Sequence, residues 1–249
     1  MSDAASPRAR DGEPRLIPGI YNYCDSRCAR CRFSARCLPY LFETRLDRAG
    51  PDADEEAIFE EIAGPRPEPP PEWEELIAEA NARASSMTPE EDAALDRQEE
   101  QHARTLANDR LAAAARGYSM SAWNITRALE SLVERRGDPV VIEAVESIGA
   151  LAGPIGSKVT RAVSSSIDAV DFGDDGFAQD AAGSAKVARL AIEESRGAWR
   201  VLSEGDRGTA DGVPAAMLRV LDEIDAQLAE RFPDAMAFVR PGFDTEDPP

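Results

Sequence analysis

The strongest hydrophobic pattern in the chain lies in residues 139–159 and has the repeat of an α-helix. Apolar side chains recur there at steps of three and four residues, which places them on one side of a helix. The stripe consists of Val141, Val145, Ile148, Ala152, Ile155 and Val159. Asp138 and Pro139 just before it are typical of a helix start. Pro154 has no amide hydrogen, so it is expected to kink or break this helix midway.

Helical patterns also cover most of the remaining chain. These stretches are 53–63, 73–84, 88–116, 121–136, 183–202 and 213–232. The third begins with Thr88, Pro89 and Glu91, residue types that form a capping box at a helix start. Gly117 is expected to end or kink that helix, because glycine has a low helix propensity. No stretch alternates between polar and apolar residues as a half-buried strand would, and no internal repeat is present.

These elements predict an all-α fold: an antiparallel bundle of four or five long helices with a small N-terminal four-cysteine metal-binding module. The proline-rich sequence GPRPEPPPE marks a spacer between the two. The predicted segments are a disordered tail (1–15), the four-cysteine module (16–48), an acidic and proline-rich connector with short helices (49–87), the helical bundle (88–232) and a C-terminal tail (233–249).

The charge of the chain limits which kinds of molecule it is expected to bind. The 249 residues carry a formal net charge of −19, yet residues 1–48 hold nine arginines against six acidic residues. A body this acidic repels a phosphate backbone, so we do not expect nucleic-acid binding. The arginine-rich front predicts an acidic protein partner instead. The N-terminus lacks the apolar core of a signal peptide, and no run approaches the ~20 apolar residues that cross a bilayer. A cytoplasmic location without membrane contact is therefore expected.

All four cysteines of the chain fall in one short sequence, YCDSRCARCRFSARC. They are Cys24, Cys28, Cys31 and Cys37, with the spacing C-x3-C-x2-C-x5-C. In a reducing compartment, clustered cysteines are more often metal ligands than disulfides. Four thiolates supply a tetrahedral zinc shell or the four corners of a [4Fe–4S] cluster. Either centre would be anionic, and arginines lie close by in the sequence: Arg27, Arg30, Arg32 and Arg36.

The spacing favours iron–sulfur over zinc. Zinc ribbons present two C-x-x-C pairs separated by ~15–20 residues, whereas this chain has one such pair and no histidine nearby. One short loop around a larger inorganic cluster fits all four ligands better. We therefore expect a [4Fe–4S] cluster with a structural, electron-transfer or redox-sensing role. A Zn²⁺ site that staples a structural or interaction protein is the alternative.

The sequence CARCRFSARC resembles the [4Fe–4S] loop of RecB-type nucleases, with Cys28, Cys31, Phe33 and Cys37 in matching places. In that family the cluster staples the nuclease domain. The resemblance implies a cluster-binding loop here, with Cys24 as the fourth ligand. It does not imply nuclease activity, because the family's acid-x-lysine signature is missing from this chain. The longer sequence IYNYCDSRCARCRFSARC, joined to GSAKVARLAIEES, also resembles an uncharacterised bacterial family, which brings no known activity.

A second metal site in the bundle is the alternative that would make the protein an enzyme. His102 is the only histidine, and Glu99 lies three residues before it, so both fall on one helix face. This Glu-x-x-His pair is the repeated unit of ferritin-like di-iron sites. Glu143, on a later predicted helix, would add a carboxylate. No catalytic residue is assigned from the sequence.

Overall fold

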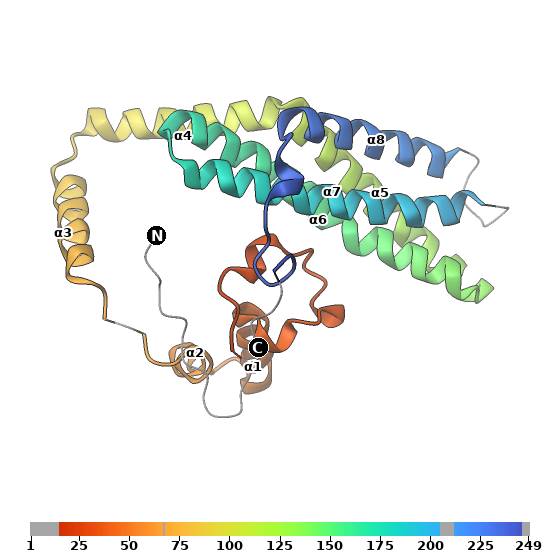
Figure 1. The fold of residues 1–249 in the computed structure, drawn as a ribbon, viewed down its shortest axis with the longest axis horizontal. Coiled ribbons are helices and arrows are strands. Elements are labelled where there is room, and N and C mark those ends of the chain that lie inside the picture. Colours follow the sequence, from red (N-terminus) through yellow and green to blue (C-terminus); the bar gives the residue numbers. More distant parts are fainter. Residues whose placement is uncertain (1–14, 67, 205–211, 246–249) are drawn as a thin grey trace. The chain divides into compact units, whose positions relative to one another are not determined.

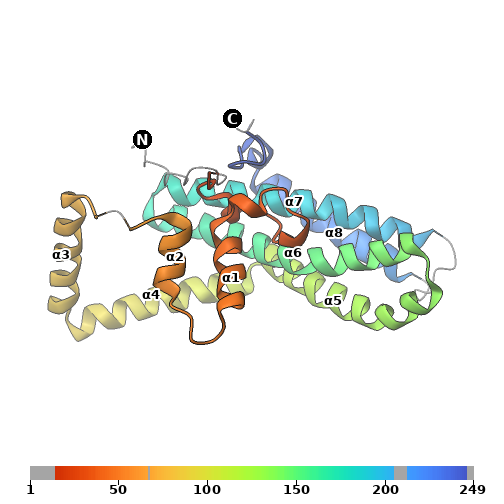
Figure 2. The ribbon, with the colours of Figure 1, turned by 90° about the horizontal axis from the view of Figure 1, so that it is seen from below.

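The computed structural model describes residues 15–66, 68–204 and 212–245, and only the backbone of residues 131–134 and 136 (Figures 1 and 2). The described residues form eight α-helices and no strand, which confirms the all-α prediction. The chain divides into two compact units. The first contains residues up to Tyr21 and Cys28–Gln101, and the second contains Asn22–Arg27 and everything from His102 onward. The predicted tail 1–15 lies outside the described residues except for Arg15.

Four helices of the second unit form a closed antiparallel bundle. They are α5 (Arg110–Arg136), α6 (Pro139–Phe172), α7 (Asp175–Ser203) and α8 (Val213–Arg231). Each packs against two others, because α5 meets α6 and α8, and α7 also meets α6 and α8. Only two residues separate α5 from α6 and α6 from α7, and such short connections make neighbouring helices antiparallel. Figure 2 shows the four running side by side, as the sequence predicts.

The bundle core is built from large side chains that are almost completely buried. They include Tyr118, Ile148, Leu151, Ile155, Ile192, Trp199, Leu202, Leu221, Ile224 and Leu228. Two of them are polar as well: Trp199 Nε1 donates a hydrogen bond of 3.0 Å to Tyr118 Oη, and Tyr118 Oη lies 2.6 Å from Ser195 Oγ. Burial raises the pKa of Tyr118. This buried network therefore stays uncharged and satisfies the polar atoms that the core encloses.

The stripe of apolar residues predicted in 139–159 belongs to α6, and all six of its members are buried. By length and composition α6 is also able to cross a membrane, contrary to the expectation that no segment does. Its buried residues, which face α5 and α7, account for this apolar character. Pro154 does not break the helix, because α6 continues through it from Pro139 to Phe172.

Two helix boundaries differ from the sequence prediction. The chain leaves helix geometry at Asp109 rather than at Gly117, which stays inside α5. Asp109 Oδ1 accepts a hydrogen bond of 2.9 Å from the amide of Ala112, so its side chain caps α5. α7 begins at Asp175 instead of residue 183, because Gly173 ends α6 in the left-handed conformation (φ 65°) and Asp174 caps α7 at once.

Residues 235–244, part of the tail predicted from residue 233, contact α7, while residues 246–249 lie outside the described residues. The short 3-10 helix η4 (Ala235–Ala237) contacts α7, and Ala235 is buried. Lys186 Nζ donates a hydrogen bond of 2.6 Å to the carbonyl of Phe238 and lies 2.8 Å from Asp244 Oδ2. A buried lysine thus attaches Phe238 and Asp244 to the bundle.

The first unit has smaller helices. They are α1 (Leu38–Ala49), α2 (Glu55–Ala63), α3 (Pro71–Ser86) and the part of α4 (Pro89–Asn108) that ends at Gln101. The ring of Phe42 on α1 meets that of Phe59 on α2 at 6.5 Å between centroids. The predicted capping box is confirmed, because the Thr88 amide donates to Glu91 Oε2 (2.8 Å) and the Glu91 amide donates to Thr88 Oγ1 (3.2 Å).

Close packing of α5 on α6 depends on a glycine, and its replacement should destabilise the bundle. A Cβ atom at Gly156 would lie 2.2 Å from Ser119 Oγ and 3.1 Å from Ser119 Cβ. We expect Gly156→Ala to lower the free energy of unfolding by ~1–3 kcal/mol, the usual effect of overpacking. Urea denaturation measures this change.

Gly197→Ala is the matched control, since a Cβ there meets no atom within 4 Å in the middle of α7. It should raise stability by ~0.5–1 kcal/mol through helix propensity alone. Equal effects of the two substitutions would show that α5 and α6 do not pack as closely as described.

Candidate metal centre

Cys24 belongs to a short segment, Asn22–Arg27, that packs on the helical bundle of the second unit. Lys158 of α6 holds this segment through its ammonium group, which donates a hydrogen bond of 2.6 Å to the carbonyl oxygen of Asn22. Only 8% of Lys158 is exposed. Burial lowers the pKa of Lys158, and the charge of nearby Cys24 partly opposes that shift. A cation therefore lies beside the first predicted ligand.

Tyr23 fixes the same segment from the other side. Its ring contacts Phe238 at 4.6 Å between centroids and lies directly on Gly183 of α7. A Cβ atom at Gly183 would come within 2.3 Å of Tyr23 Cε1, so no larger residue fits beneath the ring. The hydroxyl of Tyr23 donates to Asp180 Oδ1 at 3.3 Å. Burial, followed by the charge of Asp180, raises the pKa of Tyr23.

Asp180 gathers three donors at this position. Besides Tyr23, it accepts hydrogen bonds from Arg161 Nε (2.8 Å) and from Ser165 Oγ (2.7 Å). Burial by itself would raise the pKa of Asp180, but the hydrogen bonds from Arg161 and Ser165 outweigh burial and lower it. Asp180 is thus held as a carboxylate that keeps Tyr23 in place.

Arg27 attaches the far end of the segment to α7. It makes a two-pronged ion pair with Glu194, in which its second guanidinium nitrogen lies 2.7 Å from Glu194 Oε2. Its Nε also donates to Asp25 Oδ2 at 2.8 Å. Between these residues, Ser26 has a positive φ of 59°, a conformation that is uncommon outside glycine. The backbone around Cys24 is therefore determined by contacts at both ends.

The other three cysteines lie in the first unit on successive 3-10 turns. The amide of Cys31 donates to the carbonyl of Cys28 (3.1 Å), that of Ser34 to Cys31 (3.2 Å), and that of Cys37 to Ser34 (3.3 Å). These bonds join residues 28, 31, 34 and 37 in steps of three. Each of these positions except Ser34 is a cysteine.

Cys31 has a further contact that is typical of a metal-bound sulfur. The amide of Phe33 donates a hydrogen bond of 3.4 Å to Cys31 Sγ. Phe33 itself is only 4% exposed and forms part of the unit's small core with Ile20.

All four cysteines are half-buried thiols in this structure. Among the residues that the structure describes, no three His, Cys, Asp or Glu side chains converge closely enough to hold a metal ion. The turns between Cys28 and Cys37 are separate and do not form one regular helix, so their shared spacing does not bring the sulfur atoms together. The structure thus places each predicted ligand, and it does not assemble them.

The four arginines expected around the centre have different roles. Arg27 pairs with acidic residues of the second unit, as described above. In the first unit, Arg36 Nε donates a hydrogen bond of 2.7 Å to the carbonyl of Arg15 and holds the backbone there. Arg32 lies 4.5 Å from the centroid of the Phe33 ring. Arg30 and Arg32 are exposed.

The described residues do not assemble the alternative metal site at Glu99, His102 and Glu143. His102 contacts Ser164 and Asp168 of α6, at 3.0 Å and 3.2 Å. Glu143 is exposed and precedes Ser164 on that helix by a length of ~30 Å at 1.5 Å per residue. Glu99 is exposed and belongs to the first unit.

The sequence analysis did not single out Lys158 and Lys186, which bond to the carbonyls of Asn22 and Phe238. Lys158 and Lys186 are the only lysines, and both are buried with their ammonium groups on backbone carbonyls. A usable signal existed: a chain with 26 arginines that keeps lysine at two positions inside apolar helices. The charged tip of lysine is a compact point donor, which suits a single buried carbonyl better than a planar guanidinium does.

Comparison with known proteins gives no relative: no family model, no curated protein and no solved structure matches this chain. The resemblance of the cysteine loop to that of RecB-type nucleases therefore stays an expectation from ten residues.

Substituting Gly183 should release the segment that carries Cys24. In Gly183→Ala the new methyl group displaces the Tyr23 ring, and the backbone at Cys24 loses one of its fixed points. We expect the Cys24 thiol to react faster with iodoacetamide in metal-free protein, which peptide mass spectrometry measures. Gly117→Ala is the control, because nothing lies within 4 Å of a Cβ there. An unchanged alkylation rate in Gly183→Ala would contradict this packing.

Proposed function

We propose that Cys24, Cys28, Cys31 and Cys37 together bind a [4Fe–4S] cluster, and that the protein uses it for structure, electron transfer or redox sensing. The observation that carries the proposal is the series of hydrogen-bonded turns that contains Cys28, Cys31 and Cys37. In this series the Phe33 amide donates a hydrogen bond to Cys31 Sγ. Backbone donors to cysteine sulfur are a standard means of stabilising and tuning iron–sulfur centres.

The fourth ligand has to come from outside that run, and Cys24 meets the requirement. Four residues of chain reach at most ~14 Å when fully extended, so Cys24 is tethered close to Cys28 whatever the path between them. Its own position is held by the bundle through Lys158 and Arg27. A ligand whose backbone is already ordered loses less conformational entropy when it binds a metal.

Charge also supports the proposal. A cluster with four thiolate ligands carries a net negative charge, and burial of such a charge needs cations nearby. The Lys158 ammonium near Cys24 supplies one. The exposed Arg30 and Arg32 in turn suit an acidic protein surface, which is the partner we propose for the module.

Because four cysteines fill all ligand positions, the centre has no open site for a substrate. A [4Fe–4S] cluster with four cysteine ligands stabilises a fold or exchanges electrons. A Zn²⁺ ion with four cysteine ligands stabilises a fold only, and catalytic zinc sites keep a position open. The proposed role is therefore one of binding and redox chemistry at the module, and no catalytic step is assigned to it.

Anaerobic purification with iron and acid-labile sulfide analysis tests the proposal. We expect about four iron and four sulfide per chain, with a broad absorption band in the blue. Each single Cys→Ser substitution at residues 24, 28, 31 and 37 should lower the iron content severalfold. Ser34→Ala is the matched control, since Ser34 occupies the same three-residue repeat without a thiolate, and it should keep the cluster.

Two results would overturn the proposal. Stoichiometric zinc without sulfide would replace the cluster by a structural Zn²⁺ site. Anaerobic protein with neither metal, in which iodoacetamide modifies all four thiols at equal rates, would exclude a metal centre of either kind.

A further inference from the structure

His102, Ser164 and Asp168 form a connected set of side chains in the second unit that the cysteine centre does not involve. His102 lies on α4, while Ser164 and Asp168 lie one turn apart on α6. His102 Nε2 is 3.0 Å from Ser164 Oγ, and His102 Nδ1 is 3.2 Å from Asp168 Oδ1. The two ring nitrogens thus contact a hydroxyl on one side and a carboxylate on the other.

This connectivity is the one that activates a serine nucleophile. A carboxylate that accepts the Nδ1 hydrogen fixes the neutral tautomer of the imidazole and leaves Nε2 able to accept the serine proton. Both distances fall within hydrogen-bond reach for a nucleophile, its base and the group that orients the base. The imidazole and the carboxylate are 24% and 23% exposed, so the set is sheltered yet open to a small molecule.

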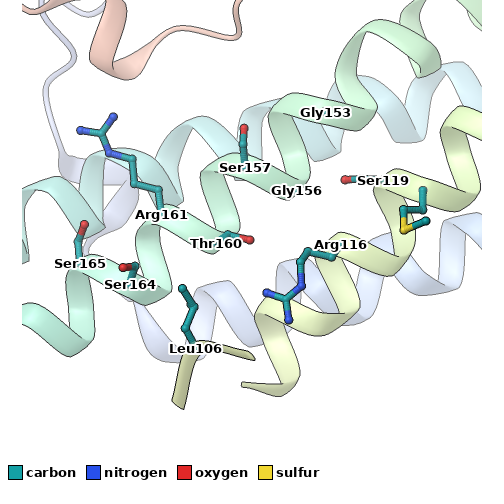
Figure 3. A pocket seen from close by; sticks show the side chains of 11 residues that line it. Leu106, Arg116, Ser119, Gly153, Gly156, Ser157, Thr160, Arg161, Ser164 and Ser165 are labelled. Atoms are coloured by element: carbon teal, nitrogen blue, oxygen red, sulfur yellow. The ribbon is translucent and has the colours of Figure 1, made fainter. Parts of the chain in front are cut away.

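Ser164 opens onto a groove with a volume of about 650 Å³ along α6 (Figure 3). The groove is lined by Leu106, Arg116, Ser119, Met120, Gly153, Gly156, Ser157, Thr160, Arg161, Ser164 and Ser165. Glycines and small hydroxyl residues of α6 line one side of it, and Arg116 of α5 reaches in from the facing helix (Figure 3). A reacting group therefore has space beside the Ser164 hydroxyl.

The groove also holds a cation for the charge that acyl transfer develops. Figure 3 shows Arg116 and Thr160 reaching from facing helices into the same space. Arg116 donates one hydrogen bond of 3.1 Å, to the carbonyl of Ala107, and its guanidinium has further N–H donors. Arg161 is committed to Asp180 through two hydrogen bonds, so Arg116 is the residue suited to a carbonyl oxygen that becomes negative.

We propose that Ser164, His102 and Asp168 make a second functional site, one that hydrolyses small carboxylic esters. Ser164 is the nucleophile, His102 the general base and acid, and Asp168 positions the imidazole. Ser164 Oγ adds to the ester carbonyl carbon while its proton passes to His102 Nε2. The C–O bond to the alcohol then breaks, and His102 returns the proton to the departing alkoxide. Water repeats the two steps on the acyl-serine, releasing the carboxylic acid and restoring the Ser164 hydroxyl.

A fluorophosphonate probe tests the site on the full-length chain without knowledge of the natural ester. We expect the probe to label the protein and peptide mass spectrometry to locate the adduct on Ser164. With p-nitrophenyl acetate, a burst of p-nitrophenol equal to the protein concentration should precede slower turnover, since an acyl-enzyme accumulates. Ser164→Ala should abolish both signals. No labelling of the wild-type protein, or an adduct on another serine, would overturn the proposal.

The substitutions of the other two residues separate chemistry from structure. His102→Gln keeps a hydrogen-bonding side chain but removes the base, and should slow labelling by ~10²-fold or more. Asp168→Asn keeps the shape but favours the wrong imidazole tautomer, so it should slow labelling while circular dichroism and the melting temperature stay near wild type. Ser203→Ala is the control, because Ser203 is an exposed serine at the end of α7 that does not line the groove, and it should label normally. Labelling that is unaffected by His102→Gln and Asp168→Asn would show that the three residues only attach α4 to α6.

Discussion

The placement of the segment that carries Cys24 depends on a partly buried hydrogen bond, from the ammonium group of Lys158 to the carbonyl of Asn22. Burial of an ammonium group costs free energy unless the group is hydrogen-bonded or paired with an opposite charge. Here it joins a core helix to a segment more than a hundred positions earlier in the chain. Lys186 does the same on α7, where its ammonium group donates to the carbonyl of Phe238. The rings of Tyr23 and Phe238 then meet over Gly183, so Tyr23 and Phe238 pack on one face of α7.

This arrangement gives the cysteine sequence two different supports. Cys24 is held by contacts with the bundle, whereas the other three cysteines depend on local 3-10 turns and on the small core around Phe33. Ligands with ordered backbones favour metal binding because less conformational freedom is lost. His102, Ser164 and Asp168 are separate from these supports. They lie on α4 and α6, and their interactions described above involve neither the cysteines nor the lysines.

Much of the fold follows from sequence because helix signals are local. The stripe on α6, the capping box at Thr88 and Glu91, and the start at Asp138 are each determined by residues within a few positions of one another. The errors have local causes too. Gly117 does not end a helix, since glycine only lowers helix propensity. The break between α4 and α5 lies at Asp109, whose side chain caps α5.

The site was less predictable, because its determinants are distant in sequence. The spacing of the cysteines indicates a metal site. Nothing in the sequence of residues 22–27 reveals that Lys158, Gly183 and Glu194 fix the position of this segment. Likewise, the Glu-x-x-His pattern suggested a metal ligand at His102. Only the packing of α4 on α6 shows that its two nitrogens are occupied by Asp168 and Ser164.

Nuclear magnetic resonance of the protein labelled with ¹⁵N-lysine tests the central claim most directly, because the chain has only two lysines. In a Lys186→Arg variant the single remaining signal belongs to Lys158. A buried, hydrogen-bonded ammonium exchanges its protons slowly, so we predict a visible Nζ–H signal at neutral pH, with nuclear Overhauser contacts to protons of Asn22 and Tyr23. A signal lost to rapid exchange with water, or one without contacts to those residues, would contradict the account.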